Sequence, residues 1–115
     1  TGKAKREFLH VDDLCSAIYL TLKTSKKKLL KISKNEFPFF NVGSRINISI
    51  KNLALLIKKL TKNKKKIIYN KKYPDGTLNK ILDSSKIRKL GWNPKIKLES
   101  GLKNIISEFQ YLNDK

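Results

Sequence analysis

The sequence has few of the residues from which metal sites, disulfide bonds and membrane spans are built. It contains one cysteine, Cys15, and one histidine, His10. One cysteine excludes a disulfide bond within the chain and is typical of a reducing compartment, so we expect a cytoplasmic protein. The same two residues are too few for a zinc site. No apolar run approaches the roughly 20 residues that span a membrane. The first residues are polar and contain no apolar segment of the kind found in signal peptides. We therefore expect no metal and no membrane partner.

Motifs of two common enzyme classes are also absent. No Ser-His-Asp arrangement is recognisable, and neither GxGxxG nor GxxxxGK[ST] occurs, so a glycine-rich phosphate loop is excluded within these 115 residues. His10 lies in an alternating segment and is interpreted as a packing or hydrogen-bonded residue rather than a general base. Cys15 has apolar neighbours and is interpreted as a small core residue.

Acidic residues are scarce compared with basic ones. The chain has 9 Asp and Glu against 27 Lys and Arg, which gives a net charge of +18. Such a field attracts polyanions, including nucleic acid and phosphorylated small molecules. Lysine, isoleucine and asparagine have A/T-rich codons, however, so a low-GC genome would produce the same excess. We favour this compositional reading, because the aromatic residues lie inside apolar runs and do not alternate with lysines as in single-strand binding proteins.

Methionine is absent, and the chain starts at Thr1. Removal of an initiator methionine would explain this start. A fragment of a longer protein would explain it equally well, and both explanations stay open.

Short apolar segments alternate with amphipathic ones along the chain, which predicts an α/β fold. A first strand is predicted around residues 8–11. A helix over about 13–23 follows, with Asp12 or Asp13 as its N-cap and a broad apolar face. The remaining predictions are strands at 37–42 and 66–69, a loop at 70–80, and helices at about 50–60, 85–90 and 99–112.

Local signals set the ends of these elements. Ser49 is a plausible N-cap for the second helix, Ser84 or Ser85 for the third, and Gly91 suits the position after the third helix ends. Residues 24–36 form a lysine-rich surface connection, in which three apolar residues either extend the first helix or pack against the body. The broad apolar face of the first helix consists of Leu14, Ala17, Ile18, Leu20 and Leu22. In the last helix, the residues expected to face inward are Leu102, Ile105, Ile106 and Phe109.

Five segments follow one another in a recognisable order: "GKAKREFLHVDD", "NVG", "ISIKNLALLI", "KIIY" and "YPDGTLNKILDSSKIRKLGWNPKIKLESGL". Together they resemble the C-terminal part of the GDP-L-fucose synthases, a branch of the extended short-chain dehydrogenase/reductase superfamily. The first segment also resembles related nucleotide-sugar epimerases, whereas the last is more specific to this branch. The resemblance covers nearly the whole chain. It implies mixed short strands and helices forming the substrate-binding side, with the Rossmann core largely missing and residues 1–115 as a single C-terminal portion of a longer enzyme.

The resemblance also implies a set of substrate-binding residues. Arg6 matches the arginine that reaches the substrate's diphosphate, a role that suits a planar guanidinium. Lys80 matches a second cation near the nucleotide-sugar, and Lys66 stands where some relatives place a basic contact. Asp75 would accept from guanine or a sugar hydroxyl. Each residue has an alternative. Arg6 would be a surface arginine paired with Glu7 or an aspartate, and Lys80 and Lys66 would be solvated surface lysines. Asp75 would form an Asx-type turn before Gly76.

The sequence departs from the family pattern at three places. Ser44 and Arg45 stand after "NVG", where a second glycine is common. Leu78 and Asn79 replace the usual proline and arginine of "TPRK", so one basic contact is lost. The lysine-rich connection 24–36 is also unlike most relatives. These changes put the identity of the substrate in question, although not the family.

By this resemblance, the complete enzyme epimerises GDP-4-keto-6-deoxy-D-mannose and reduces it with NADPH to GDP-L-fucose. NADP(H) would be bound by the missing N-terminal part, and the family's catalytic residues lie upstream of Arg6, so Cys15 and His10 are not catalytic. The chain alone is expected to be inactive, and the full-length enzyme to be a homodimer. The alternatives are another nucleotide-sugar epimerase or dehydratase of the superfamily, and a stand-alone basic nucleic-acid-binding protein.

Overall fold

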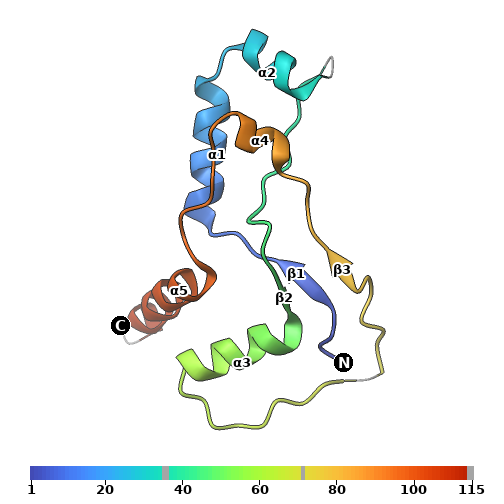
Figure 1. Cartoon of the computed structure of the whole chain (residues 1–115). Helices are drawn as coiled ribbons and strands as arrows, with labels where there is room; N and C mark the ends of the chain where they lie inside the picture. Colours follow the sequence, from blue (N-terminus) through green and yellow to red (C-terminus); the bar gives the residue numbers. More distant parts are fainter. Residues whose placement is uncertain (35–36, 71, 114–115) are drawn as a thin grey trace. The chain divides into compact units, whose positions relative to one another are not determined.

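The computed structural model of the chain describes residues 1–34, 37–70 and 72–113. Its contacts form two compact units. Unit 1 consists of residues 1–6, 47–80 and 97–115, and unit 2 consists of residues 7–46 and 81–96. The chain therefore passes from one unit to the other four times, after Arg6, Ile46, Lys80 and Ile96. Figure 1 labels the helices and strands along the chain.

A small three-stranded sheet organises unit 1. Its strands are β1 (Lys5–Glu7), β2 (Asn47–Ser49) and β3 (Asn79–Lys80), in the order β2-β1-β3. The central strand β1 runs parallel to β3, with Lys5 opposite Asn79 and Arg6 opposite Lys80. The last residue of β1, Glu7, is already the first residue of unit 2.

Helix α3 (Ile50–Leu60) follows β2 without a linker and is held at its first turn by the N-terminal segment. The predicted N-cap Ser49 is confirmed, because its hydroxyl accepts from the backbone N–H of Asn52 at 3.1 Å. The N–H groups of Ile50 and Lys51 donate to the carbonyls of Ala4 and Gly2. These three bonds satisfy most of the free N–H groups at the start of the helix, so this end is not an open anion site.

Helix α5 (Leu98–Asn113) packs against α3 in unit 1. Only part of its expected inward face is covered. Leu102 and Ile106 are half-buried, whereas Ile105 is 50% and Phe109 67% exposed, which corrects the prediction for these two residues. The helix has a wider apolar face than α3 alone can cover.

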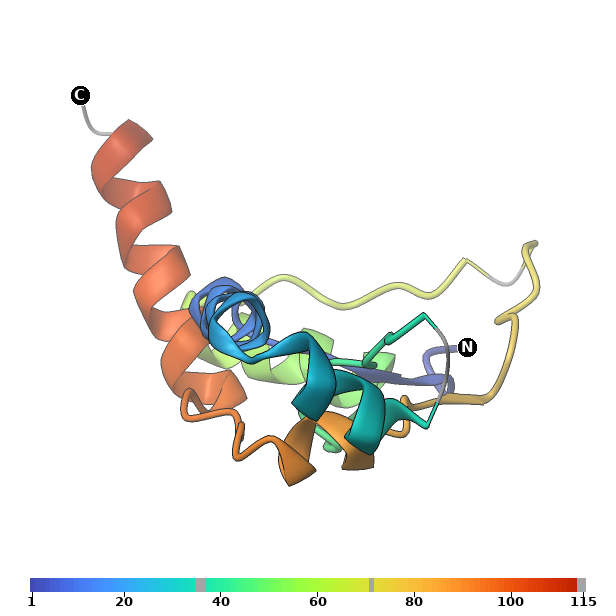
Figure 2. The same ribbon diagram turned by 90° about the horizontal axis from the view of Figure 1, so that it is seen from above.

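Unit 2 holds the apolar core of the chain. It is built from α1 (Val11–Lys23), α2 (Lys26–Ser33) and α4 (Ser85–Lys89), and both Figures 1 and 2 show α2 lying beside α4. Thr24 and Ser25 are extended and separate α2 from α1, and residues 35–36 of the lysine-rich connection lie outside the described residues. The buried core residues are Ala17, Ile87, Leu90 and Trp92, and the partly buried ones packed around them are Leu9, Leu20, Leu29, Ile32, Phe40 and Val42.

Polar bonds fix the helices of this core. His10, not an aspartate, is the N-cap of α1, because its Nδ1 accepts from the N–H of Asp12 at 3.2 Å. Asp13 is buried instead, and its two carboxylate oxygens accept from the N–H groups of Lys95 and Ile96, each at 2.9 Å. A carboxylate with two backbone donors is well satisfied in a buried position.

Around α4, one expectation is confirmed in full and one in part. Gly91 follows the helix at a φ of +98°, as expected for a residue in the position after a helix end. Ser84 stands at the N-cap position, as one of the two serines predicted there, but its side chain makes no cap bond. The Oδ1 of Asp83 accepts from Ser85 N at 2.9 Å instead. This N–H bond lowers the pKa of the Asp83 carboxyl below its ordinary value. The core indole of Trp92 donates to the Ser16 hydroxyl at 2.8 Å.

The predicted strands are wrong in position. Residues 37–42 and 66–69 are not strands, and the first strand covers 5–7 and not 8–11. Phe40 and Val42 pack on the core from an irregular segment, while Phe37 and Phe39 are exposed. Apolar runs at these places reflect packing rather than strand pairing. The exposed strand β3 lies in a stretch predicted as loop.

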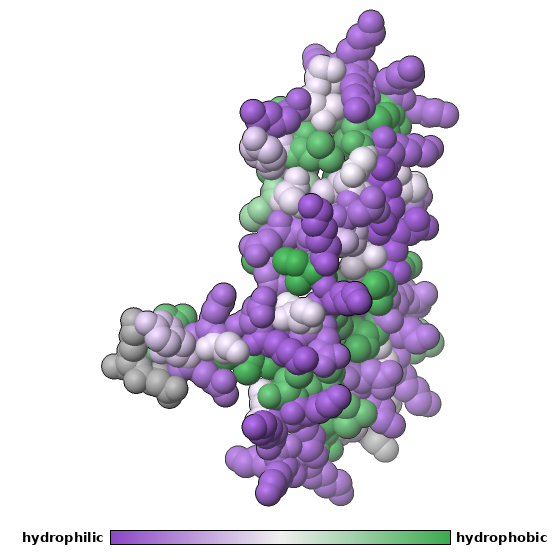
Figure 3. Space-filling view, turned by 60° about the vertical axis from the view of Figure 1, so that its left-hand side comes forward, coloured by the Kyte–Doolittle hydropathy of each residue, from purple (hydrophilic) through white to green (hydrophobic). Residues whose placement is uncertain are grey.

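Helix α1 has two apolar faces, and only one is covered. Ala17 and Leu20 pack in the core, whereas an exposed stripe of apolar side chains runs along another side, and Cys15 is exposed too, contrary to the prediction. This stripe consists of Val11, Leu14, Ile18 and Leu22, which are between 40% and 80% exposed. Figure 3 shows apolar patches lying between polar side chains on one face of the molecule. Among the described residues, no helix is long and apolar enough to cross a membrane.

Candidate functional site

Arg6 stands in the middle of β1, with its guanidinium turned toward the loop before β3. Its Nη1 donates to the carbonyls of Lys5 and Thr77, both at 2.7 Å. Gly76, at a φ of +68°, lies beside the guanidinium, since a Cβ built there would be 3.8 Å from Arg6 Nη2. The loop and the strand together hold one edge of the guanidinium by backbone oxygens.

The guanidinium carries no opposing charge. Within residues 1–34, 37–70 and 72–113, no carboxylate forms an ion pair with Arg6. The alternative of a surface arginine paired with Glu7 is therefore not what the structure shows, because the Glu7 carboxylate is bonded to backbone groups instead. A half-buried guanidinium bonded only to neutral carbonyls keeps its full charge available for an anion.

Lys80 is the partner of Arg6 across the sheet. Paired residues on neighbouring strands direct their side chains to the same face, so the register of Arg6 with Lys80 places two cations on one side of a two-strand ladder. Lys80 is exposed. Two adjacent cations of this kind suit a doubly charged oxyanion such as a diphosphate.

Asp75 is engaged elsewhere in the loop that contacts Arg6. Its carboxylate accepts from the amino group and the hydroxyl of Thr1. The carboxylate therefore ties the loop to the N-terminal segment of unit 1.

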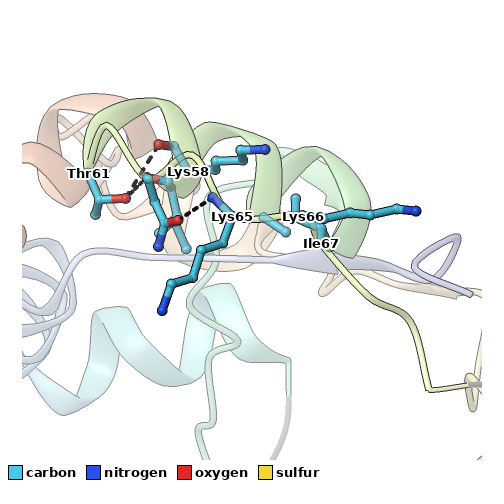
Figure 4. A pocket seen from close by; sticks show the side chains of 8 residues that line it. Lys58, Thr61, Lys65, Lys66 and Ile67 are labelled. Atoms are coloured by element: carbon cyan, nitrogen blue, oxygen red, sulfur yellow. Dashed lines mark hydrogen bonds between the residues drawn. The ribbon is translucent and has the colours of Figure 1, made fainter.

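Lys66 lies in a different part of unit 1. It lines a pocket of about 320 Å³ at the end of α3, together with seven neighbours from α3 and the following segment. Figure 4 shows the ends of Lys65 and Lys66 pointing to different sides of this pocket. Among the described residues, no hydrogen bond or ion pair joins Lys66 to Arg6, Lys80 or Asp75. The role of Lys66 stays a prediction from the resemblance.

Glu7 is not among the residues that the sequence predicts for this site, although it follows Arg6 directly. One carboxylate oxygen accepts from the N–H of Arg45, and the other accepts from the N–H of Leu82 at 3.0 Å. The carboxylate fills the space where a side chain on Gly43 would stand, 2.6 Å from that Cβ position. A glycine directly after "NV" is the only sequence signal for this arrangement, and it does not identify its partner.

Two Tyr-x-x-x-Lys spacings occur in the sequence, Tyr19 with Lys23 and Tyr111 with Lys115, and Lys115 lies outside the described residues. The first pair lies on α1, where the lysine is 5.5 Å from the centre of the tyrosine ring. Tyr19 is 63% exposed. The pair stands on the helix surface in unit 2, and the 115 residues contain no glycine-rich loop that would bring a dinucleotide to it. We assign it no catalytic role.

The arrangement around Arg6 can bind and orient an anion. The register of Arg6 with Lys80 places two cations side by side, and the Asp75 carboxylate of the adjoining loop accepts from the Thr1 hydroxyl. A nicotinamide dinucleotide does not fit this chain on the evidence of its residues, because the phosphate-binding glycines are absent.

Known proteins show what the chain is similar to. A putative GDP-L-fucose synthase 2 of Arabidopsis thaliana is 42% identical over 102 residues, which cover 89% of this chain and 28% of that protein. The GDP-L-fucose synthase of Escherichia coli K12 is 34% identical and is covered to 32% of its length. The resemblance to these synthases is confirmed, and the chain spans under a third of the relatives' length.

A solved structure agrees with this likeness. The GDP-6-OMe-4-keto-L-xylo-heptose reductase from C. jejuni matches with a TM-score of 0.86 and 38% identity, over 98% of this chain and 33% of that chain. The expected α/β fold is confirmed. The family model described as GDP-mannose 4,6 dehydratase matches residues 1–105, and the chain belongs to this family.

Proposed function

We propose that this chain is the nucleotide-sugar-binding part of a GDP-L-fucose synthase, with Arg6 and Lys80 as its diphosphate clamp. The observation that carries the proposal is their register across β1 and β3, with the Arg6 guanidinium donating to two neutral backbone carbonyls. A guanidinium donates two parallel hydrogen bonds to adjacent phosphate oxygens, and the lysine adds a point charge beside it. Asp75 and Lys66 are weaker candidates for contacts to the base and sugar.

The complete enzyme would epimerise GDP-4-keto-6-deoxy-D-mannose and reduce it with NADPH. NADP(H) and the catalytic residues would belong to the polypeptide that this chain lacks relative to its relatives, and the complete enzyme would be a cytoplasmic homodimer. The contribution of these residues is to hold the GDP moiety so that the keto-sugar meets the catalytic groups. The likeness to curated GDP-L-fucose synthases supports this choice.

A second candidate is a related GDP-sugar reductase with a different sugar. The likeness to the C. jejuni heptose reductase favours it. Leu78 and Asn79, which replace a proline and an arginine of the synthase pattern, lie just before Lys80. The diphosphate clamp would be the same in both enzymes, so the sugar alone separates these candidates.

The test uses the protein read from the complete coding sequence. NADPH oxidation is measured with GDP-4-keto-6-deoxy-D-mannose, with a GDP-keto-heptose, and with UDP- and dTDP-keto-sugars. We expect turnover with the GDP-deoxyhexose and not with the UDP or dTDP compounds. Preference for the heptose would select the second candidate. A start codon directly before Thr1, or turnover of UDP-sugars alone, would overturn the assignment to GDP-L-fucose synthase.

A further inference from the structure

The Glu7 carboxylate joins the segments that flank the central strand on both sides. Arg45, which donates to one of its oxygens, lies two residues before β2. Leu82, which donates to the other at 3.0 Å, lies two residues after β3. Since the sheet order is β2-β1-β3, one side chain on β1 binds the chain where it enters β2 and where it leaves β3.

These bonds stand where the chain changes unit. It leaves unit 1 after Arg6 and after Lys80, and it returns after Ile46. Glu7 is the first residue beyond one of these points, and Arg45 and Leu82 lie within two residues of the others. All three bonded residues belong to unit 2, so the contacts themselves are within one unit.

The surroundings are shaped for a carboxylate. Gly43 leaves the space that it fills, because a Cβ there would lie 2.6 Å from Oε1 and 2.8 Å from Oε2. The two donors are backbone N–H groups of exposed residues. When the carboxylate is removed they lose the acceptor that they share and are left to water, so the two segments are no longer joined.

The strands that carry the two cations are short. β1 has three residues and β3 has two, and their ladder holds two residue pairs. A ladder of this length fixes Arg6 and Lys80 weakly by itself, because strand stability grows with the number of paired residues and their packing. Bonds just beyond its end therefore contribute a large share of its order.

We propose that Glu7 is a positioning residue for nucleotide-sugar binding, which holds the ends of β1 and β3 so that Arg6 and Lys80 stay in register. The proposal rests on the proposed function of these two cations. Glu7 itself touches no substrate, since its carboxylate is occupied by backbone donors.

The first measurement is hydrogen–deuterium exchange of the complete enzyme, which does not depend on activity. In Glu7→Ala, the peptides that contain Arg45 and Leu82 should exchange faster, while α3 keeps its protection. Glu7→Gln should be intermediate, because its amide offers one acceptor oxygen and turns an NH₂ toward the second donor. Unchanged exchange at both peptides would overturn the proposal.

The second measurement is the steady-state kinetics of the same variants. Loss of position without loss of chemistry should raise the KM for the GDP-sugar by roughly 10- to 100-fold, with kcat and the KM for NADPH unchanged. Gly43→Ala keeps the carboxylate but displaces it, so it should raise the same KM and remains informative if Glu7→Ala fails to fold. Glu108→Gln, the same chemical change on the exposed surface of α5, should have no effect.

The possible results separate the two proposals. Faster exchange with an unchanged KM would show that Glu7 is structural only and would overturn the positioning role. A lowered kcat at constant KM would overturn it as well. If the unaltered enzyme does not use GDP-sugars at all, the proposed function fails, even where the exchange experiment shows that Glu7 holds both segments.

Discussion

The two units of the chain are stabilised in different ways. Unit 2 buries Ala17, Ile87, Leu90 and Trp92, whereas the only buried apolar side chain described in unit 1 is Ala4. Unit 1 instead relies on backbone bonds among its short strands, the first turn of α3 and the N-terminal segment. The candidate cations stand in the unit that has almost no apolar core. Substitutions of buried residues in unit 2 should therefore lower the free energy of unfolding. Substitutions that weaken ligand binding should lie in unit 1.

Removing the largest core side chain should have the largest effect. Trp92→Ala deletes an indole that is 4% exposed and its bond to Ser16. We expect the free energy of unfolding to fall by about 3–5 kcal/mol, measured by urea denaturation. Phe109→Ala, at a position 67% exposed in unit 1, should stay within about 0.5 kcal/mol of the unaltered chain. Equal losses would break the contrast between the units.

Removing the candidate clamp should affect binding more than folding. In the complete enzyme, Arg6→Ala should weaken binding of the GDP-sugar by about 2–3 kcal/mol, the scale of charge-assisted hydrogen bonds. Isothermal titration gives the affinity and urea denaturation the stability. Arg6→Lys keeps the positive charge but loses the two parallel N–H donors of the guanidinium. Its affinity should therefore lie between those of Arg6→Ala and the unaltered enzyme. A loss of stability as large as the loss of affinity would mean that Arg6 is mainly structural.

Asp13 tests whether buried polar bonds matter as much as packing in unit 2. Asp13→Ala leaves the N–H groups of Lys95 and Ile96 without their acceptor. We expect a loss of about 2 kcal/mol in the free energy of unfolding. The neighbouring Asp12 has an exposed side chain, and Asp12→Ala should cost less than about 1 kcal/mol through the helix dipole alone. A reversed order would contradict the assignment of Asp13.

A pH series gives a smaller effect in the same unit. The N–H of Ser85 lowers the pKa of Asp83 in the folded chain. A carboxyl whose pKa is lower in the folded than in the unfolded chain stabilises the fold fully at pH values above its unfolded pKa of about 3.9. This stabilisation is lost as the pH falls through the lower folded pKa. Asp83→Asn should therefore make the free energy of unfolding fall less steeply below about pH 4, in urea denaturations at a series of pH values. An identical pH dependence in both chains would contradict this.

The smallest effect is expected from the lysines of α2. Replacing Lys26, Lys27 and Lys28 with glutamine removes three exposed charges in unit 2. If the basic excess is compositional, the affinity of the complete enzyme for the GDP-sugar should be nearly unchanged. An effect equal to that of Arg6→Ala would show that long-range attraction, and not a local clamp, binds the anion.

Local signals predicted the helices well and the strands poorly. The helical spacing of apolar residues and the N-cap Ser49 predict α3, and Gly91 predicts the end of α4. These signals are reliable because each depends on contacts within one helical turn. The strands β2 and β3 have two or three residues and exist only through pairing with a distant segment. The apolar run 37–42 lacks such a partner and packs as irregular chain, so its composition is misleading.

The candidate site was predictable only in part, for the same reason. Arg6 and Lys80 come from the resemblance, and no periodicity relates two residues so far apart in the chain. Their register and the bonds of Glu7 to Arg45 and Leu82 are properties of the folded sheet. The aspartates after "FLHV" looked like helix caps, since Asp is common there, but His10 takes that place and Asp13 binds residues near the other end of the chain.

The distance in sequence between these partners has a consequence for how the protein is made. Glu7 and Leu82, Ser16 and Trp92, and Asp13 and Lys95 are 75, 76 and 82 residues apart. During synthesis, residues 7–16 have no access to these partners until residues 82–95 have emerged from the ribosome. Closing loops of this length is slow compared with forming the helices. We therefore expect the β1–β3 ladder and the core around Trp92 to form late in folding, and a chain truncated before residue 79 would lose both together.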